Sequence, residues 1–141
     1  MKKLSKGLII ALSLLTVASC ARNDIKYYSV SESLNTAEAK KVIDPNIALY
    51  FGQDVPGQLL LKDAKTNRKT NAYGKEDFKT CNWAFLSAVV SLQKRAKSLG
   101  ATKVTNILSN YKGSTFKTPG QYECHVGNVV SRVSLIGDIK K

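Results

Sequence analysis

The sequence has few of the residues that bind metals or form nucleophile–base pairs. It contains one histidine and three cysteines in 141 residues, and no CxxC pair, whereas a zinc site takes three or four ligands. His125 directly follows Cys124, and neighbours on a strand point to opposite faces, so the two cannot easily share a metal ion or a proton. The patterns GxSxG, HExxH and GxxxxGK[ST] are absent as well. We therefore expect no metal, no cofactor and no catalytic site.

The sequence also lacks a hydrophobic run long enough to span a bilayer. Its longest apolar run, Gly7 to Val17, has 11 residues, whereas a membrane helix needs about 20. The run follows the basic residues Lys2, Lys3 and Lys6, and this order is typical of a bacterial export signal. We expect residues 1–19 to be a signal peptide.

The signal ends in Val17-Ala18-Ser19-Cys20, which resembles a lipobox, the site where a bacterial diacylglyceryl group is attached to cysteine. The resemblance implies that Cys20 becomes the acylated N-terminus, and several acyl chains anchor a protein stably where one does not. Ala21, in place of Asp, favours the outer membrane, facing the periplasm. The alternative is a soluble secreted protein with an odd cysteine near its start.

Carboxylates are scarce: ten Asp and Glu stand against 22 Lys and Arg, for a net charge of +12. Three of these charges lie in the signal peptide, so residues 20–141 carry +9. Such a balance favours anionic partners. Within Lys62–Lys79, six cations stand against three carboxylates. We interpret this stretch as a basic loop that is either simply solvated or a binding surface. The candidate binding residues are Lys65, Arg68, Lys69 and Lys75.

One long helix is predicted over Cys81–Leu99, where apolar residues recur at spacings of three and four. Thr80 is its expected N-cap and Gly100 its expected end. Trp83 and Phe85 are interpreted as core residues. The alternative is that they form an exposed aromatic platform for a ligand.

Strands are predicted on both sides of this helix, over Asn46–Gly52, Gln58–Leu61, Lys103–Tyr111 and Tyr122–Ile136. The last has a slip in its apolar phase at Gly127, interpreted as a β-bulge. Residues 20–45 are interpreted as a lipidated tether with a short helix, and residues 46–141 as one domain. The expected fold class is α+β: strand–strand–helix–strand–strand, one long helix on a mainly antiparallel sheet of three to four strands.

Cys81 and Cys124 remain as an even pair once Cys20 is lipidated. In an oxidising compartment such a pair predicts a disulfide. The bond would join the start of the helix to the last strand. Metal or thiol chemistry at Cys81 is the alternative.

The strings KTNAYGKEDFKTCNWAFLSAVVSLQKRAKSLGATKVTNI and YECHVGNVVSRVSLIGD resemble small bacterial proteins catalogued as an excinuclease ATPase, the A component of excinuclease ABC. The resemblance spans about Leu34 to Lys141. No P-loop is present. We therefore do not expect a DNA-repair ATPase, despite the catalogue name. More loosely, Cys81, Cys124 and Gly127 are similar to positions of the Rcs-system outer-membrane sensor lipoprotein and of YbjQ-like domains. That resemblance implies a disulfide-linked periplasmic domain that signals envelope stress by binding other proteins.

These observations predict a non-catalytic envelope lipoprotein that acts as an interaction or stress-sensing module. Its partners would be the membrane, through the anchor, and other envelope proteins. The alternative function is binding of anionic lipids or lipopolysaccharide through the basic loop. Nucleic acid is not expected as a partner, because export would separate it from this protein.

Overall fold

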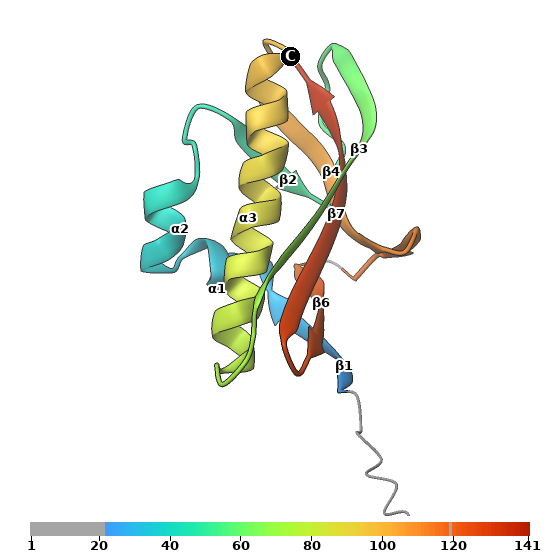
Figure 1. The fold of residues 1–141 in the computed structure, drawn as a ribbon. Helices are drawn as coiled ribbons and strands as arrows, with labels where there is room; N and C mark the ends of the chain where they lie inside the picture. The colour runs from blue at the N-terminus through green and yellow to red at the C-terminus, as the bar shows by residue number, and fades with distance from the viewer. Residues whose placement is uncertain (1–21, 119) are drawn as a thin grey trace, which may run out of the picture.

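A computed structural model describes residues 22–118 and 120–141 of the chain (Figure 1). The predicted signal peptide and the predicted lipidation site, Cys20, lie outside the described residues. Within them, seven strands and three helices follow one another: β1 (Asn23–Ser29), α1 (Val30–Leu34), α2 (Ala37–Val42), β2 (Ala48–Phe51), β3 (Leu59–Asn71), α3 (Asp77–Ser98), β4 (Lys103–Tyr111), β5 (Ser114–Phe116), β6 (Gln121–Gly127) and β7 (Val130–Lys140).

The long helix forms where the apolar periodicity placed it, although it begins earlier. Phe85, Val89 and Leu92 are buried on one face of α3. The helix begins at Asp77, so Thr80 is not its N-cap. The Thr80 hydroxyl instead donates to the Asp77 carbonyl (3.1 Å) and lies 2.7 Å from the Ser131 hydroxyl. Gly100, with φ +72°, follows the helix end. The placement of Trp83 in the core is wrong, because its side chain is 41% exposed.

The sheet has seven strands, so the expected fold class, with its sheet of three to four strands, is wrong. β7 is the central strand. It pairs with β3 along one edge, and with β6 and then β4 along the other, all antiparallel. β1 extends the sheet beyond β6, and β2 joins β4 in parallel. The expected bulge at Gly127 is a turn instead, because β6 ends there and β7 begins at Val130.

Two segments interpreted as irregular are strands. The tether prediction is wrong from residue 23 onward, since β1 pairs with β6 from Asn23–Gly127 to Ser29–Gln121 and α1 follows. The short helix expected within this stretch is confirmed as α2. β1 escaped detection because most of it is exposed and only Tyr28 and Ser29 are half-buried. The loop prediction for Lys62–Lys79 is wrong up to Asn71. That part is strand β3, whose buried residues, Ala64 and Thr66, are neither large nor strongly apolar.

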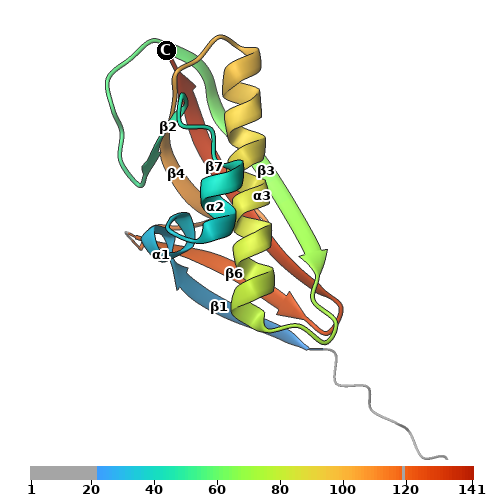
Figure 2. The ribbon, with the colours of Figure 1, turned by 90° about the vertical axis from the view of Figure 1, so that its left-hand side faces the viewer.

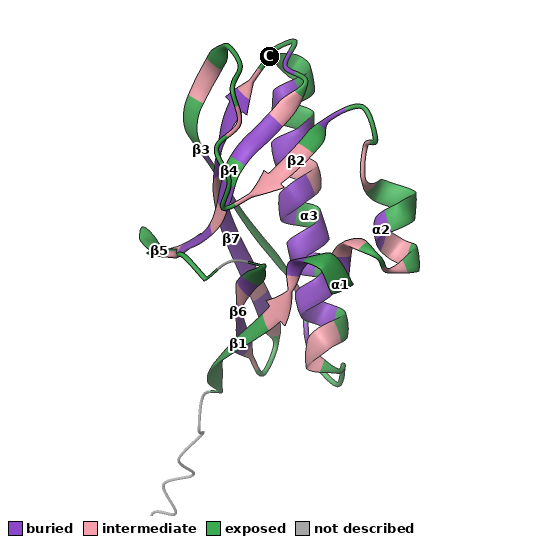
Figure 3. Ribbon diagram, turned by 180° about the vertical axis from the view of Figure 1, so that it is seen from behind, coloured by how far each residue is buried: buried purple, intermediate pink, exposed green. Residues whose placement is uncertain are grey.

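The three helices lie on one face of the sheet, as the view onto them in Figure 2 shows. The core fills the space between α3 and the sheet, and in Figure 3 the buried residues run along α3, β4 and β7. Phe85 of α3 stacks on Tyr122 of β6 with ring centroids 4.0 Å apart. The predicted Cys81–Cys124 disulfide is confirmed, and it joins the first turns of α3 to β6.

Candidate functional site

The structure divides the four basic residues that the sequence singled out. Lys65, Arg68 and Lys69 lie on β3, and Lys75 lies in the loop between β3 and α3. Because side chains alternate along a strand, Arg68 lies on the helix side, whereas Lys65 and Lys69 start from the helix-free face. The Arg68 guanidinium donates to the Ser91 hydroxyl of α3 (3.0 Å). Lys75 is therefore separate from a cluster built on β3 and α3.

A groove runs between β3 and α3. It consists of two hollows, of about 450 Å³ and about 320 Å³, which share Ser91 and Lys94 in their linings. Such volumes fall in the range of ordinary ligand sites. The larger hollow is lined by Leu61, Asp63, Ala64, Lys65, Thr66, Ser91, Leu92, Lys94, Arg95 and Ser98. The smaller is lined by Arg68, Lys69, Ser87, Val90, Ser91 and Lys94. We call the two together the β3–α3 groove.

The β3–α3 groove is strongly cationic. Its linings contain one carboxylate, Asp63, and the five cations Lys65, Arg68, Lys69, Lys94 and Arg95. None of these five forms an ion pair with a carboxylate of the described residues. Cations gathered in a concave, partly desolvated site raise the local concentration of anions. The groove is therefore suited to an anionic occupant.

The helix residues of this groove were missed in the sequence. Lys94 and Arg95 are not among the candidate binding residues that the sequence analysis singled out. The available signal is a stripe of polar residues, mostly serine, beside the apolar face. Ser87, Ser91, Lys94 and Ser98 follow one another at spacings of four, three and four, which places them on one side of a helix. The side becomes a groove wall only because β3 lies next to it, which the sequence did not reveal.

The outer edge of β3 borders the groove. Within residues 22–118 and 120–141, β3 pairs with β7 and with no other strand. The Ala72 N–H donates to the Val129 carbonyl (2.7 Å), so the backbone groups of Ala72 point toward β7. These groups alternate in direction along an antiparallel strand, and the register is regular from Ala64 to Asn71. The N–H and C=O groups of Lys65, Asn67 and Lys69 therefore point away from β7.

A second polar cluster lies on the helix-free face. His125 is 8% exposed, its Nε2 hydrogen-bonds Glu123 Oε1, and its ring stacks on Tyr111 with centroids 3.3 Å apart. Arg132 is its register partner on β7. The adjoining hollow, about 140 Å³, is lined by Asn23, Tyr111, His125, Gly127, Val130 and Arg132. The only hydroxyl or thiol group among these lining side chains is the phenol of Tyr111. The cluster is thus a packed histidine–carboxylate pair on the surface of the sheet.

Metal ligands do not gather in the described part of the chain, where no group of three or more His, Cys, Asp or Glu side chains is placed to hold an ion. None of the described helices combines the length and hydrophobicity that crossing a membrane requires. Comparisons with protein-family models, curated proteins and solved structures found no match.

Proposed function

We propose that the protein is a non-catalytic envelope lipoprotein, anchored through Cys20 on the periplasmic side of the outer membrane, whose domain binds an acidic partner protein in the β3–α3 groove. The signal and lipobox sequence support the anchor. The Cys81–Cys124 disulfide is in keeping with an oxidising compartment. The observation that carries the proposal is the groove itself, in which five cations face one carboxylate.

The edge of β3 favours an extended peptide as the occupant. A segment that added to β3 would bond to the outward backbone groups of Lys65, Asn67 and Lys69, as in recognition by strand addition. Its side chains would alternate between the two faces of the sheet. Every second side chain would then lie in the β3–α3 groove, near Arg68 and Lys94. Carboxylates at those positions would meet charge-assisted hydrogen-bond donors.

Anionic lipid is the second candidate, because phosphate groups satisfy the same cations. A lipid phosphate would use the charges of the groove without using the edge of β3. The two occupants therefore differ in which backbone N–H groups they touch. A third outcome is that the cations only protect an exposed edge strand from pairing with other copies, which is a common use of lysine at such edges.

The test measures amide chemical shifts during titration with a peptide of alternating glutamate and valine, and separately with phosphatidylglycerol vesicles. Strand addition predicts that the peptide shifts the amides of Lys65, Asn67 and Lys69 more than those of Ala64, Thr66 and Arg68. Lipid binding predicts that the vesicles perturb the groove without this alternation. A peptide of alternating lysine and valine is the charge control and should not bind.

Charge reversal supplies the matched variants. The double variant R68E/R95E should weaken binding of the acidic peptide at least tenfold, because it replaces two attractions by two repulsions. The control K40E/K41E makes the same change of charge on α2, away from the groove. If both variants bind the peptide as the unchanged protein does, the proposed groove function is wrong and the cations serve only to protect the edge.

A further inference from the structure

Four segments that are distant in sequence meet at one end of the molecule. They are the start of β1, the turn between β6 and β7, the β3–α3 loop and the first turn of α3 (Figures 1 and 2). Asn23 pairs with Gly127, and the Ala72 N–H donates to the Val129 carbonyl. Arg22 bonds to Asp77 through both terminal nitrogens. We call this end the β1 end.

The β1 end carries the most exposed large apolar side chains of the described residues. Tyr73 in the β3–α3 loop is 76% exposed, and Val129 in the β6–β7 turn is 59% exposed. Ile25, two residues into β1, follows at 50%. Single exposed apolar residues are ordinary on protein surfaces. Here the leading two lie in loops joined by the Ala72–Val129 hydrogen bond, so they form one apolar tip.

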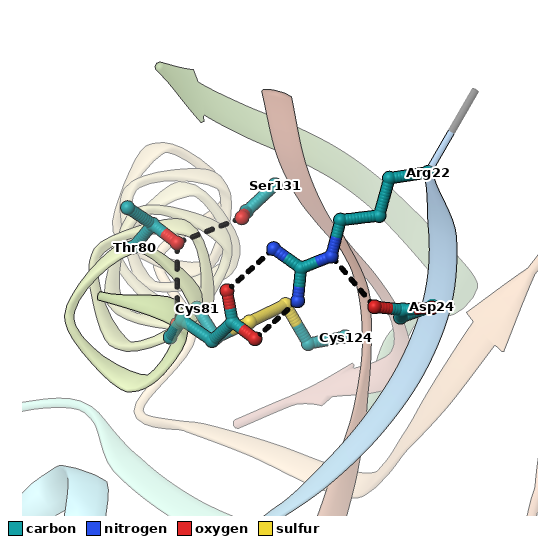
Figure 4. Close-up of polar contacts among 7 residues, drawn as sticks. Arg22, Asp24, Thr80, Cys81, Cys124 and Ser131 are labelled. Carbon is teal, nitrogen blue, oxygen red and sulfur yellow. Dashed lines mark hydrogen bonds and ion pairs between the residues drawn. A yellow bond between two sulfur atoms is a disulfide. The ribbon is translucent and has the colours of Figure 1, made fainter. Parts of the chain in front are cut away.

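The types of side chain around this tip suit a phospholipid surface. Arg22 bonds to both Asp24 and Asp77 (Figure 4), so its single positive charge offsets one of these two carboxylates at the β1 end. Lys75 and Lys79 are exposed and follow Tyr73 in the sequence, with Glu76 and the Arg22-bonded Asp77 between them. Tyrosine and lysine are residues that anchor proteins at the boundary between headgroups and acyl chains, since each has an apolar body and a polar end.

The length of chain before β1 fixes which end can face the membrane. Three Cα–Cα steps separate Cys20 from Asn23, and at ~3.8 Å per step they span at most about 11 Å. An acyl group on Cys20 holds that residue at the membrane surface. Asn23 must therefore stay within about 11 Å of the surface. The opposite end of the molecule is much farther away, because β3 alone has 13 residues and at ~3.3 Å each runs about 40 Å.

We propose that the β1 end rests on the phospholipid surface, with Tyr73 and Val129 inserted among the headgroups beside the acylated Cys20. This inference rests on the lipid anchor of the proposed function. It makes the domain a body held against the membrane rather than one that swings on a long tether. Lys75, which the sequence grouped with the groove cations, belongs to this membrane contact. The β3–α3 groove then runs outward from the membrane, since both β3 and α3 have one end at the tip.

The test uses the processed lipoprotein in vesicles of phosphatidylethanolamine and phosphatidylglycerol. Tyr73→Trp is made together with Trp83→Phe, so that residue 73 is the sole tryptophan of the chain. The matched control is Leu59→Trp with Trp83→Phe, because Leu59 is also exposed but lies at the far end of β3. We expect blue-shifted emission, quenched by brominated acyl chains, for tryptophan 73 and neither effect for tryptophan 59.

Intact mass separates the two ways of failing. If the mass shows acylated residues 20–141 and tryptophan 73 is quenched no more than tryptophan 59, the membrane contact is wrong and the proposed lipoprotein stands. If the mass shows no acyl chains, both fall. Protection of tryptophan 73 only when a second envelope protein is added would identify a protein occupant and also overturn the inference. In Y73S/V129S, whose positions are exposed, the domain should fold unchanged while the rate of extraction by mild detergent rises.

Discussion

Arg22 joins the start of β1 to the first turn of α3 through two hydrogen bonds to Asp77, with Nη1 3.0 Å from Oδ1 and Nη2 bonded to Oδ2. The two residues are 55 positions apart in the sequence. Asp77 lies four residues, about one helical turn, before Cys81 in α3, and Cys81 forms the disulfide with Cys124 (Figure 4). The end of the molecule nearest the proposed anchor is thus held by one covalent and one ionic link.

The Arg22–Asp77 pair predicts a specific pH dependence. The hydrogen bond from Arg22 is the largest of the effects that hold the pKa of Asp77 below its ordinary value, which is about 3.9. Since the folded pKa is depressed, the stabilisation is present above pH ~4 and is lost as the pH falls through the lower folded value. In R22Q the pKa of Asp77 should rise toward the ordinary value. Carboxyl-carbon NMR titration measures it, and the Asp54 carboxylate, which pairs with Lys140, should titrate unchanged.

Removal of the disulfide should be costly, because Cys81 and Cys124 are 43 positions apart. The chain-entropy model gives about 4 kcal/mol for a loop of this length. The variant C81A/C124A avoids burying new polar groups, since both sulfurs are fully buried. Its free energy of unfolding in urea should fall by about that amount. An unfolding midpoint equal to that of the oxidised protein would contradict the prediction.

The Tyr122 hydroxyl and the Ser33 hydroxyl form a buried hydrogen bond of 2.9 Å between β6 and α1. Burial raises the pKa of Tyr122, and the bond to Ser33 opposes the rise. The variant Y122F leaves the Ser33 hydroxyl with no partner from β6 and should cost about 1–2 kcal/mol of unfolding free energy. The double variant Y122F/S33A removes both polar groups and should be closer to the unchanged protein than Y122F is. The opposite order would contradict this account.

Gly137 lies where β7 crosses β4 closely. A Cβ at this position would lie 3.0 Å from Val104 Cγ1 and 3.2 Å from the Thr105 carbonyl. Because one contact is backbone and the other is a buried core residue, G137A should destabilise the protein by about 1–3 kcal/mol. The exposed substitution T102A is the control and should change stability by less than about 0.5 kcal/mol. A G137A protein as stable as the control would show that the two strands can move apart freely.

The sequence predicted the elements whose burial is continuous. The periodicity of Phe85, Val89 and Leu92 predicted α3 because its face is buried along nearly its whole length. The count of cysteines predicted the disulfide. The start of β3 was predicted as the strand Gln58–Leu61, but the rest of β3 was missed because its outer edge is solvated, and a solvated edge admits Lys65, Arg68 and Lys69 in a strand. Trp83 was misplaced because it lies one position outside the buried stripe, where helical spacing alone still allows burial.

Only part of the candidate site could be predicted from the sequence. The cations of β3 were found as local charge density. Lys94 and Arg95 were not, because a groove is a relation between two elements, and no pattern within α3 states that β3 is its neighbour. The sequence shows the excess of cations in this stretch. It does not show that Arg68 lies on the opposite face of the sheet from Lys65 and Lys69, because this depends on the pairing of β3 with β7.

The position of β7 has a consequence for how the chain is made. β7 is the central strand of the sheet and the last element of the chain, and β1 finds its partner β6 roughly a hundred residues later. A chain that emerges with its N-terminus first therefore leaves β1 unpaired until β6 has been made, and β3 unpaired until β7 has been made. Folding governed by such distant pairings is slow. A nascent chain interrupted before Val130 leaves β3 without its partner strand, so β3 can join the sheet only after β7 has been made.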